Sequence, residues 1–539
     1  MKGKKILSIL LCVALLTGCG QGQGESKSGN NETDGKSSST SAVSVETQPE
    51  ELEHMEISVA CWMDDDDLAG DAVIDLIEEK FNVDFVPMAF TWDDYITKTQ
   101  LWAATDSLPD MFAADVRNSG DFVAWIEEGI IRSIPSDLSA YPNLEVYNDV
   151  ATTQECMYKG EQYAIYRSNY ETESDLVKDR FVIYRWDLAQ AAGIEKEPEN
   201  WDEFREMLLA IIKADPEGKN IGGMTSQEIG VMADPFLCYS VPRACYNHWV
   251  QEDDGTYVPA YFAGENLGDD VLATWQLARD MYVEGTIDQD IALTTLDSSK
   301  NKFVNGQSAA LIGTDTTIFS TSTSSIYSMW QALYGSPMEE SVKVLDLMPA
   351  VDGETYFWEM TMGWSETLFS SHVDDEKMDR ILMILDYLAS EEGNLLVYYG
   401  FEGEDYTVKD GLIERTEKFV DKGISDVYPS TTLFKDFLAW IVLLPDTYII
   451  GQGRVPWYLD FVGSYQAQAE ACNMPEYSME AKQQFMTLGS SFNYVKQDDL
   501  LLIMTGTEPV EDMWNELLEG YKQDGLEDVI AQVNAAMQE

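Results

Sequence analysis

The side chains that most often carry out catalysis are scarce in this sequence, and no motif brings them together. The three histidines are His54, His248 and His372, and none stands in an HExxH pattern that would bind zinc. The sequence also lacks a GxSxG elbow and a Walker A loop. A serine or metal hydrolase would have to assemble from scattered residues, whereas a glycosidase needs only two carboxylates, which the 96 acidic residues do not exclude.

Aromatic and polar side chains follow two predicted strands, at the place where α/β proteins bind their ligands. Residues 56–62 form the first predicted strand, which ends at Trp62, and residues 110–113 form another. The polar residues that follow these strands are Asp64, Asp115, Arg117 and Asn118. Predicted helices alternate with the strands, which indicates parallel pairing and a ligand beyond the carboxyl ends. The alternative is that Trp62 packs in the core and that the acidic loop after it is only solvated.

The composition excludes one class of partner and indicates more than one folding unit. Asp and Glu total 96 against 34 Lys and Arg, which gives a formal charge of −62. Nucleic acids and anionic lipid surfaces would be repelled, because no basic patch interrupts this charge. The chain has 539 residues, of which 45% are apolar. This is more than one hydrophobic core usually holds, so we expect two or three structural units.

The N-terminus has the form of a secretory signal. A basic start precedes an apolar run that is too short to cross a bilayer as a mature helix, and Thr17-Gly18-Cys19 follows it. These residues resemble the lipobox of bacterial lipoproteins, which implies that residues 1–18 are removed and that Cys19 carries a diacylglyceryl group and palmitate. Residues 19–52 are predicted to be a flexible tether. The chain would then be lipid-anchored at the extracellular face of the cell membrane, whereas with a plain signal peptide Cys19 would be incidental.

The remaining cysteines do not indicate a disulfide framework. They are Cys61, Cys156, Cys238, Cys245 and Cys472. Their odd number and the absence of a CxxC pair also argue against a structural zinc site. We expect small buried apolar residues, with a Cys238–Cys245 bridge as the alternative, and we expect neither a metal nor a cofactor.

The rest of the chain continues the α/β pattern without an internal repeat. Hydrophobic periodicity predicts helices at 71–81, 95–105, 120–128, 201–213, 269–284, 378–389 and 509–537, the last with breaks at Gly520 and Gly525. Further strands are predicted at 83–86, 182–186 and 309–313. This alternation predicts an α/β fold.

Several runs of residues, taken in order, resemble a known family. They are SLPDMFAAD (107–115), EEGIIRSIPSDLSAYPNL (127–144), KGEQYAIY (159–166), ENWDEFREMLLAIIKADPEG (199–218), LARDMYVEGTIDQD (277–290), KFVNGQSAALIG (302–313), DYLASEEGNLLVYYGFEGEDY (386–406) and LLLIMTGTEPVEDMWNELLEGYKQDGLEDVI (500–530). The chain resembles the extracellular solute-binding lipoproteins of carbohydrate ABC transporters. That family implies a two-lobed, periplasmic-binding-protein-like (Venus-flytrap) clamp, in which each lobe is an α/β layer and hinge crossovers join the lobes.

By the same resemblance, residues 53–168 and 291–350 form the first lobe, and residues 169–290 and 351–539 form the second. A carbohydrate, expected to be an oligosaccharide, binds in the cleft between them. The chain is expected to be a monomer without catalytic activity that binds no nucleic acid and delivers the sugar to the integral-membrane permease subunits of an ABC transporter. The alternatives are a cell-surface glycoside hydrolase or polysaccharide-processing lipoprotein, and an adhesive lipoprotein with a degenerate cleft.

The resemblance also implies which side chains hold the sugar. Aromatic rings would cover the apolar faces of a pyranose, while carboxylates, amides and arginines bind its hydroxyls. The expected ligand-binding residues are Trp62, Asp64, Asp115, Arg117, Asn118, Tyr166, Arg167, Tyr239, Asp315, Trp358, Trp364 and Trp457. For each of them the alternative is a place in the core or on a solvated surface.

One loop departs from the pattern of the family. Many relatives carry a calcium loop resembling DPNGNGKxDE, whereas residues 215–224 read DPEGKNIGGM. Only Asp215, Pro216 and Gly218 match, and the alternating oxygen ligands and the closing acid that calcium needs are missing. We therefore expect no calcium at this loop.

Overall fold

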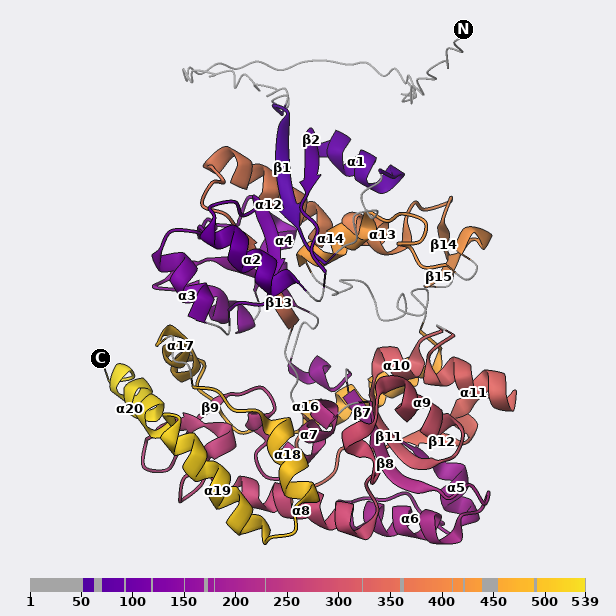
Figure 1. The fold of residues 1–539 in the computed structure, drawn as a ribbon. Coiled ribbons are helices and arrows are strands. Elements are labelled where there is room, and N and C mark those ends of the chain that lie inside the picture. The colour runs from indigo at the N-terminus through magenta and orange to yellow at the C-terminus, as the bar shows by residue number, and fades with distance from the viewer. Residues whose placement is uncertain are drawn as a thin grey trace, which may run out of the picture. The chain divides into compact units, whose positions relative to one another are not determined.

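The computed structural model describes most of the chain after residue 51. The described residues are 52–538 without 63–69, 92–93, 118–119, 150, 169–172, 179, 228, 322, 359–362, 410, 420–421, 439–453 and 489–491. The chain divides into two units, Met1–Glu51 and Leu52–Glu539, and every helix and strand named below belongs to the second (Figure 1). The predicted signal peptide, Cys19, Asp64 and Asn118 lie outside the described residues.

The first sheet has five strands in the order β2-β1-β3-β13-β6. Their bounds are β1 Met55–Ala60, β2 Val83–Pro87, β3 Met111–Ala114, β6 Ala164–Ser168 and β13 Gly363–Phe369. β1 pairs in parallel with β2 and β3, and β13 runs antiparallel to β3 and β6. Ile57, Val59 and Ala60 of β1 are fully buried, as expected for a strand that is covered on both faces.

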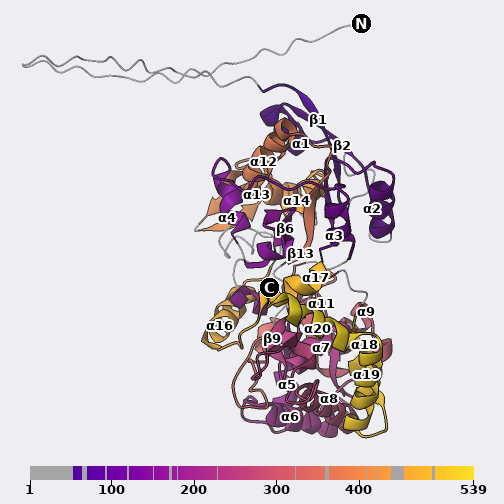
Figure 2. The same cartoon turned by 90° about the vertical axis from the view of Figure 1, so that its left-hand side faces the viewer.

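Helices from distant parts of the chain surround the first sheet (Figures 1 and 2). They are α1 Ala72–Phe81, α2 Tyr95–Ala104, α3 Gly120–Glu127, α4 Pro142–Asn148, α12 Asp375–Ala389, α13 Glu391–Tyr399 and α14 Thr431–Leu438. α1 begins where the carboxylate of Asp71 accepts hydrogen bonds from the first turn, and it ends at Asn82 in the left-handed conformation. α12 packs against α1 and α4 and buries Ile381 and Leu385.

The second sheet has four strands in the order β12-β7-β11-β8. Their bounds are β7 Arg180–Arg185, β8 Gly222–Ser226, β11 Ser308–Thr314 and β12 Val342–Val344. β11 runs parallel to β8 and antiparallel to β7. β8 passes very close to the main chain at Thr286. A Cβ placed on Gly223 would lie 2.1 Å from the main-chain carbonyl of Thr286. Only glycine fits this position without a shift of the backbone.

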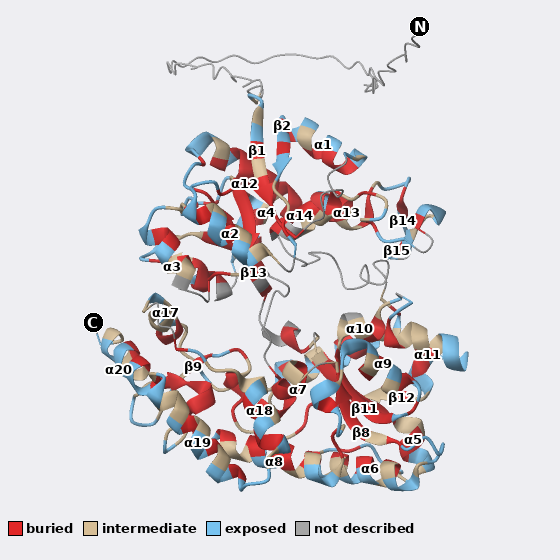
Figure 3. Ribbon diagram, in the orientation of Figure 1, coloured by how far each residue is buried: buried red, intermediate tan, exposed pale blue. Residues whose placement is uncertain are grey.

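Helices from the middle and the end of the chain form the layers on and beyond the second sheet. They are α5 Trp186–Ala191, α6 Trp201–Ala214, α7 Ile229–Leu237, α8 Val271–Glu284, α9 Leu296–Val304, α10 Asp315–Phe319, α11 Ile326–Tyr334, α16 Trp457–Ala471, α17 Met479–Thr487, α18 Lys496–Thr505, α19 Val510–Gln523 and α20 Leu526–Ala536. α18 and α19 pack against α8, and the indole N–H of Trp514 in α19 donates to the carbonyl of Gly268 at 2.8 Å. The C-terminal helices are therefore part of the same core (Figure 3).

Three short hairpins complete the described strands. They are β4 Met157–Tyr158 with β5 Glu161–Gln162, β9 Trp249–Gln251 with β10 Tyr257–Pro259, and β14 Tyr406–Lys409 with β15 Leu412–Arg415. Among the described residues, no helix has both the length and the apolar character that crossing a membrane requires.

The strand pairing corrects part of the expected division between the lobes. We expected residues 291–350 in the first lobe, but β11 and β12 from this stretch pair with β7 in the second sheet. We expected residues 351–539 in the second lobe, but β13 pairs with β3 and β6 in the first sheet. Both assignments are wrong at these strands. β3 in the first sheet and β8 and β11 in the second are buried on both faces, so an apolar run such as that of β11 does not reveal which sheet it joins.

Candidate functional site

Trp62 lies two residues beyond the carboxyl end of β1. The rings of Phe90 and Tyr95 meet its indole edge-on, with centroids 5.1 and 5.0 Å away. Arg167, which is fully buried and donates to the hydroxyl of Ser365, places its guanidinium 5.1 Å from the Trp62 ring centroid. Trp62 is only 6% exposed. The predicted residues Trp62 and Arg167 therefore lie together, in a packed arrangement in which a cation contacts the aromatic ring.

Arg117, in the loop after β3, is the centre of a buried polar cluster. Its Nε donates to Glu155 Oε2 at 2.9 Å, and its Nη1 donates to Glu366 Oε2 at 3.1 Å. Its Nη2 donates to the hydroxyls of Tyr166 and Tyr246 at 2.9 and 3.3 Å. The predicted residues Arg117 and Tyr166 thus lie together, and the Arg117 side chain is 2% exposed. In this structure Arg117 binds Glu155 and Glu366, and the Tyr166 hydroxyl donates to the carbonyl of Gly363.

The cluster joins elements that belong with different sheets. Glu366 lies in β13 of the first sheet, and Glu155 lies in the 3-10 helix Ala151–Cys156 that contacts β6. Lys482 comes from α17, which packs against β9 and α20 and also against α3. The Lys482 Nζ donates to Glu155 Oε1 at 3.0 Å and lies 3.8 Å from the ring centroid of Tyr246. The hydroxyl of Tyr246 donates to the same carboxylate at 3.1 Å.

The two carboxylates of this cluster have opposite pKa shifts. Burial raises the pKa of Glu366 to about 7, although Arg117 and two backbone N–H groups oppose the rise, and Asp115 adds to it. For Glu155 burial also acts to raise the pKa, but the positive charges of Lys482 and Arg117 outweigh it and lower the pKa to about 2. The number of cations beside each carboxylate decides the sign, since Glu155 has two and Glu366 has one.

An acid with a near-neutral pKa beside an ionised carboxylate is the pairing that glycosidases use for acid and base catalysis. Here Glu155 and Glu366 are both fully buried and both bound to Arg117. A carboxylate that hydrolyses a glycosidic bond must lie within hydrogen-bond reach of the substrate. This pair therefore connects elements of the fold and is not exposed to a sugar.

Asp315 and Trp457 come together at one end of the second sheet. Asp315 is the first residue of α10, directly after β11. Its Oδ2 accepts hydrogen bonds from Nε and Nη2 of Arg454, at 3.1 and 2.8 Å. Trp457 begins α16 three residues after Arg454 and meets the ring of Phe319 edge-on, with the centroids 5.0 Å apart. Asp315 and Trp457 are both half-buried.

Trp358 reaches the same end of the second sheet, but Tyr239 does not. The indole N–H of Trp358 donates to the carbonyl of Arg180, and Arg180 pairs with Thr314 at the end of β11. Tyr239 instead lines a separate cavity of about 350 Å³ beside Trp201 at the start of α6. Trp364 lies in β13, and its side chain is outside the described part of the chain.

The loop that departs from the calcium pattern is held by its own hydrogen bonds. Asp215 ends α6 with φ of 36°, and its carboxylate accepts from the N–H groups of Lys219 and Asn220 at 3.0 and 3.1 Å. Nowhere in the described ranges do three side chains of the kinds that hold a metal ion come together. The absence of calcium at this loop stays a prediction.

The cysteines are distributed largely as expected. Cys61, Cys156 and Cys238 are buried, whereas Cys245 and Cys472 are half-buried. The sulfur atoms of Cys238 and Cys245 are 3.7 Å apart, well beyond the ~2 Å of a disulfide bond. The two thiols are adjacent without being bridged.

Sequence reasoning did not anticipate most of the buried cluster. The residues it missed are Glu155, Tyr246, Glu366 and Lys482. They are far from Arg117 in the chain, so no local spacing connects them. One usable signal was the acid in the strand sequence GWSETLF, because a carboxylate in a buried strand requires a partner.

A model of the bacterial extracellular solute-binding protein family matches residues 72–398, which is more than half of the 539-residue chain. The chain belongs to this family. The match covers β2, β3, β7, β8, β11 and β13, so it includes strands of both sheets, the loop that carries Arg117 and the start of α10 at Asp315. The description of the family names solute binding, which agrees with the solute-binding role expected from the sequence.

Two Bacillus subtilis (strain 168) proteins are related to this solute-binding protein. Lipoprotein LipO is 25% identical over 345 residues, which span 61% of this chain and 63% of LipO, just under two thirds of its length. The polygalacturonan/rhamnogalacturonan-binding protein YtcQ is 23% identical over 378 residues, which span 67% of this chain and 69% of YtcQ.

A solved structure supports the fold of this solute-binding protein. The ABC-transporter substrate-binding protein FusA of S. pneumoniae, in complex with kestose, has a TM-score of 0.62. The sequences are 14% identical, and the superposition covers 90% of this chain and 98% of FusA. The expected class, a two-lobed α/β fold of the periplasmic-binding-protein type, is confirmed.

Proposed function

We propose that this solute-binding protein captures a carbohydrate, an oligosaccharide, and delivers it unchanged to the permease of an ABC transporter. Family membership supports capture of a solute. YtcQ is named for binding polygalacturonan and rhamnogalacturonan, which are polysaccharides, and FusA was solved with kestose, a trisaccharide. Both support a ligand of more than one sugar unit. The observation that carries the proposal is the gathering of aromatic and carboxylate side chains at strand ends in both sheets.

The proposed contacts are the half-buried groups at these strand ends. On the first sheet the half-buried group is Asp115, which follows β3, whereas Trp62 and Arg167 are buried. On the second sheet Asp315 follows β11 and Trp457 begins α16. Carboxylates would accept hydrogen bonds from sugar hydroxyls, and the Trp457 ring would cover an apolar face of a pyranose. A sugar held by groups from both sheets favours the closed form, since a ligand shifts a conformational equilibrium only through contacts it makes better in one state.

The proposal includes the anchor and the partners. Cys19 would carry the lipid that holds the chain at the outer face of the cell membrane, and the relative LipO is named as a lipoprotein. Two or more acyl chains make such an anchor stable, because each buried methylene contributes about 0.8 kcal/mol. The protein would act as a monomer that meets the permease subunits of its transporter.

The test is a titration of the purified chain, without its signal peptide, with neutral oligosaccharides and oligogalacturonides. Binding would be followed by tryptophan fluorescence, and each sugar would be recovered and analysed afterwards. We expect saturable binding of at least one oligosaccharide, recovered intact. Shortened products would show a hydrolase, and no binding to any glycan would contradict capture of a carbohydrate.

A matched pair of variants tests the position of the contact. Trp457→Ala should weaken binding by about 2- to 13-fold, the equivalent of the roughly 0.5–1.5 kcal/mol of an aromatic contact. Trp186→Ala is the control, because Trp186 is also half-buried but follows Arg185, at the opposite end of β7 from Arg180. Equal losses in both variants would contradict a contact at Trp457.

A further inference from the structure

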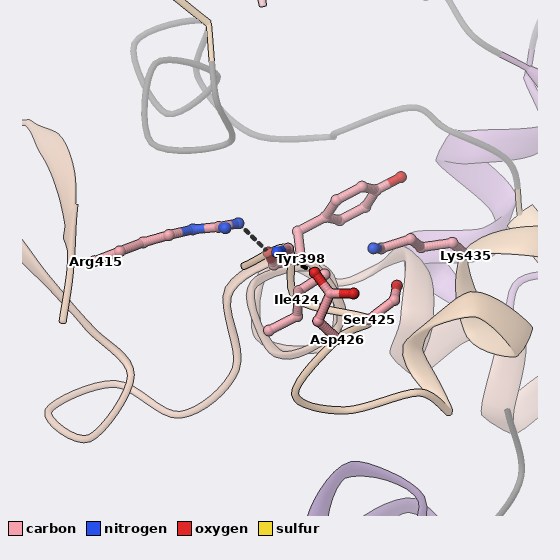
Figure 4. Close-up of a pocket in the computed structure, with 7 residues that line it drawn as sticks. Tyr398, Arg415, Ile424, Ser425, Asp426 and Lys435 are labelled. Atoms are coloured by element: carbon pink, nitrogen blue, oxygen red, sulfur yellow. Dashed lines mark hydrogen bonds between the residues drawn. The ribbon is translucent and has the colours of Figure 1, made fainter. Parts of the chain in front are cut away.

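A cavity of about 300 Å³ lies beside the β14–β15 hairpin, and none of the strand-end residues described above lines it (Figure 4). Its lining comes from α13, β15, α14 and the loop before α14. The side chains that face it are Tyr398, Arg415, Ile424, Ser425, Asp426 and Lys435. The volume is at the lower end of the range of about 300–1,000 Å³ that ligand pockets occupy, which suits one sugar unit better than a chain of several.

Arg415 reaches this cavity without a carboxylate partner among the residues that the structure describes. Its Nη2 donates to the carbonyl of Tyr398 at 3.0 Å. Its guanidinium lies 5.5 Å from the ring centroid of Tyr399 and 5.3 Å from that of Phe419. Its Nε is buried and has no hydrogen-bond partner within the described ranges. Burial lowers the pKa of Arg415, which is the sign of a positive charge that the fold has not compensated.

A second cation and an aromatic ring stand on the other side of the cavity. The Lys435 Nζ lies 5.3 Å from the ring centroid of Tyr398, and Figure 4 shows its ammonium pointing toward the Tyr398, Ser425 and Asp426 side chains. Asp426 is exposed, and its Oδ2 accepts from the N–H of Gly423 at 2.7 Å. The cavity thus combines two positive charges with one carboxylate, one hydroxyl and one aromatic face.

Positive side chains line this cavity although the chain as a whole is acidic. The whole sequence has a formal charge of −62, whereas Arg415 and Lys435 both belong to this lining. Arginine binds carboxylates with two parallel hydrogen bonds, and lysine adds a point charge. The face of a tyrosine covers the apolar side of a sugar ring, while a carboxylate and a hydroxyl bind ring hydroxyls. Simple anions would use only the first of these features.

We propose that this cavity is a second binding site, for a carboxylate-bearing sugar unit, a uronate. Arg415 and Lys435 bind the sugar carboxylate, the Tyr398 ring lies against the C–H face, and Ser425 and Asp426 bind hydroxyls. The site takes the unit either as a free monosaccharide or as part of a longer chain. It does not depend on the strand-end contacts of the proposed function.

Isothermal titration of the full chain with D-galacturonate, D-galactose and acetate tests this assignment. Galactose has the same ring with a hydroxymethyl group in place of the carboxylate, and acetate has the carboxylate without the ring. We expect galacturonate to bind at least tenfold more tightly than either. Galactose or acetate binding as tightly as galacturonate would overturn the proposal. If trigalacturonate binds more tightly than galacturonate, the site binds a uronate that is part of a longer chain. If the two affinities are equal, the site binds the free monosaccharide. Both results support the site.

Variants place the binding in this cavity. Lys435→Gln and Arg415→Gln should each weaken galacturonate binding at least tenfold. Both residues are half-buried, and the lysine variant keeps the test valid if Arg415→Gln fails to fold. Lys409→Gln is the control, because Lys409 lies in the same hairpin but outside the cavity lining and pairs with Glu414. Unchanged galacturonate affinity in Lys435→Gln, or an equal loss in Lys409→Gln, would overturn the proposal. Neutral oligosaccharide binding is measured in the same variants, and its presence or absence reports on the proposed function separately.

Discussion

Replacing Glu366 by glutamine should remove a pH dependence from the stability of the protein. Burial raises the pKa of Glu366 from 4.5 to about 7 in the folded chain. Between these values the folded state holds a proton that the unfolded state has lost. The free energy of unfolding therefore falls as the pH rises through this range and levels off above pH 7. The glutamine variant has no such proton to lose.

The size of the effect follows from the shift. The rise from 4.5 to about 7 corresponds to roughly 3 kcal/mol over the full range, since a tenfold change in proton affinity is worth about 1.4 kcal/mol. About 2–3 kcal/mol of this falls between pH 5 and pH 8. Glu155 does not confound this window, because its pKa is lowered to about 2. The ionised carboxylate of Glu155 stabilises the folded chain at pH values above the pKa that Glu155 has in the unfolded chain. This stability is lost only as the pH falls from about 4.5 toward 2.

Urea unfolding at pH 5, 6, 7 and 8 measures this prediction. The wild-type free energy of unfolding, minus that of Glu366→Gln, should decrease by about 2–3 kcal/mol from pH 5 to pH 8. Glu265→Gln is the control, because Glu265 is exposed in a loop, and its difference from the wild type should stay constant. A Glu366→Gln difference that does not change with pH would refute the account of the buried cluster.

Three further changes have expected outcomes. Lys482→Met leaves the buried Glu155 carboxylate with one cation fewer and should lower the free energy of unfolding by about 3–5 kcal/mol; a loss below 1 kcal/mol in urea unfolding at pH 7 would contradict the ion pair. Gly223→Ala should lower the thermal midpoint because its Cβ meets a main-chain carbonyl, whereas Gly230→Ala in α7, with open space around the new Cβ, should leave it unchanged or raise it; equal shifts would contradict the close approach. Cys19→Ala should move the chain from the membrane fraction to the medium when cells are fractionated and blotted, and full membrane retention would argue against the lipid anchor.

The local pattern of the sequence predicts most elements of the fold. The helix expected at 201–213 is α6 Trp201–Ala214, and Asn200 caps it as its residue type suggests. The strand expected at 309–313 is β11 Ser308–Thr314. Gly525 does separate α19 from α20, but Gly520, also expected as a break, lies inside α19. A single glycine costs a helix only about 1 kcal/mol, which the packing of α19 outweighs.

The pairing of distant segments could not be predicted in the same way. Local patterns describe strands and helices, but they do not say which sheet β11 or β13 joins. The same limit applies to the candidate site. The strand-end rule selects Trp62 and Arg117, but it does not reveal that Arg117 binds Glu155 and Glu366, which are 38 and 249 residues away. Only its position in the chain predicts Tyr239 as a ligand-binding residue, and Tyr239 lies in a different cavity.

Hydrogen–deuterium exchange with and without a bound oligosaccharide tests most directly whether a sugar is held at the strand ends of both sheets. The sugar would be the best ligand of the fluorescence panel, at saturating concentration. We predict slower exchange in the peptides that contain Asp115 and Arg117 and in those that contain Asp315 and Trp457, with no change around Tyr239. Protection confined to one sheet, or protection centred on the Tyr239 cavity, would contradict the account.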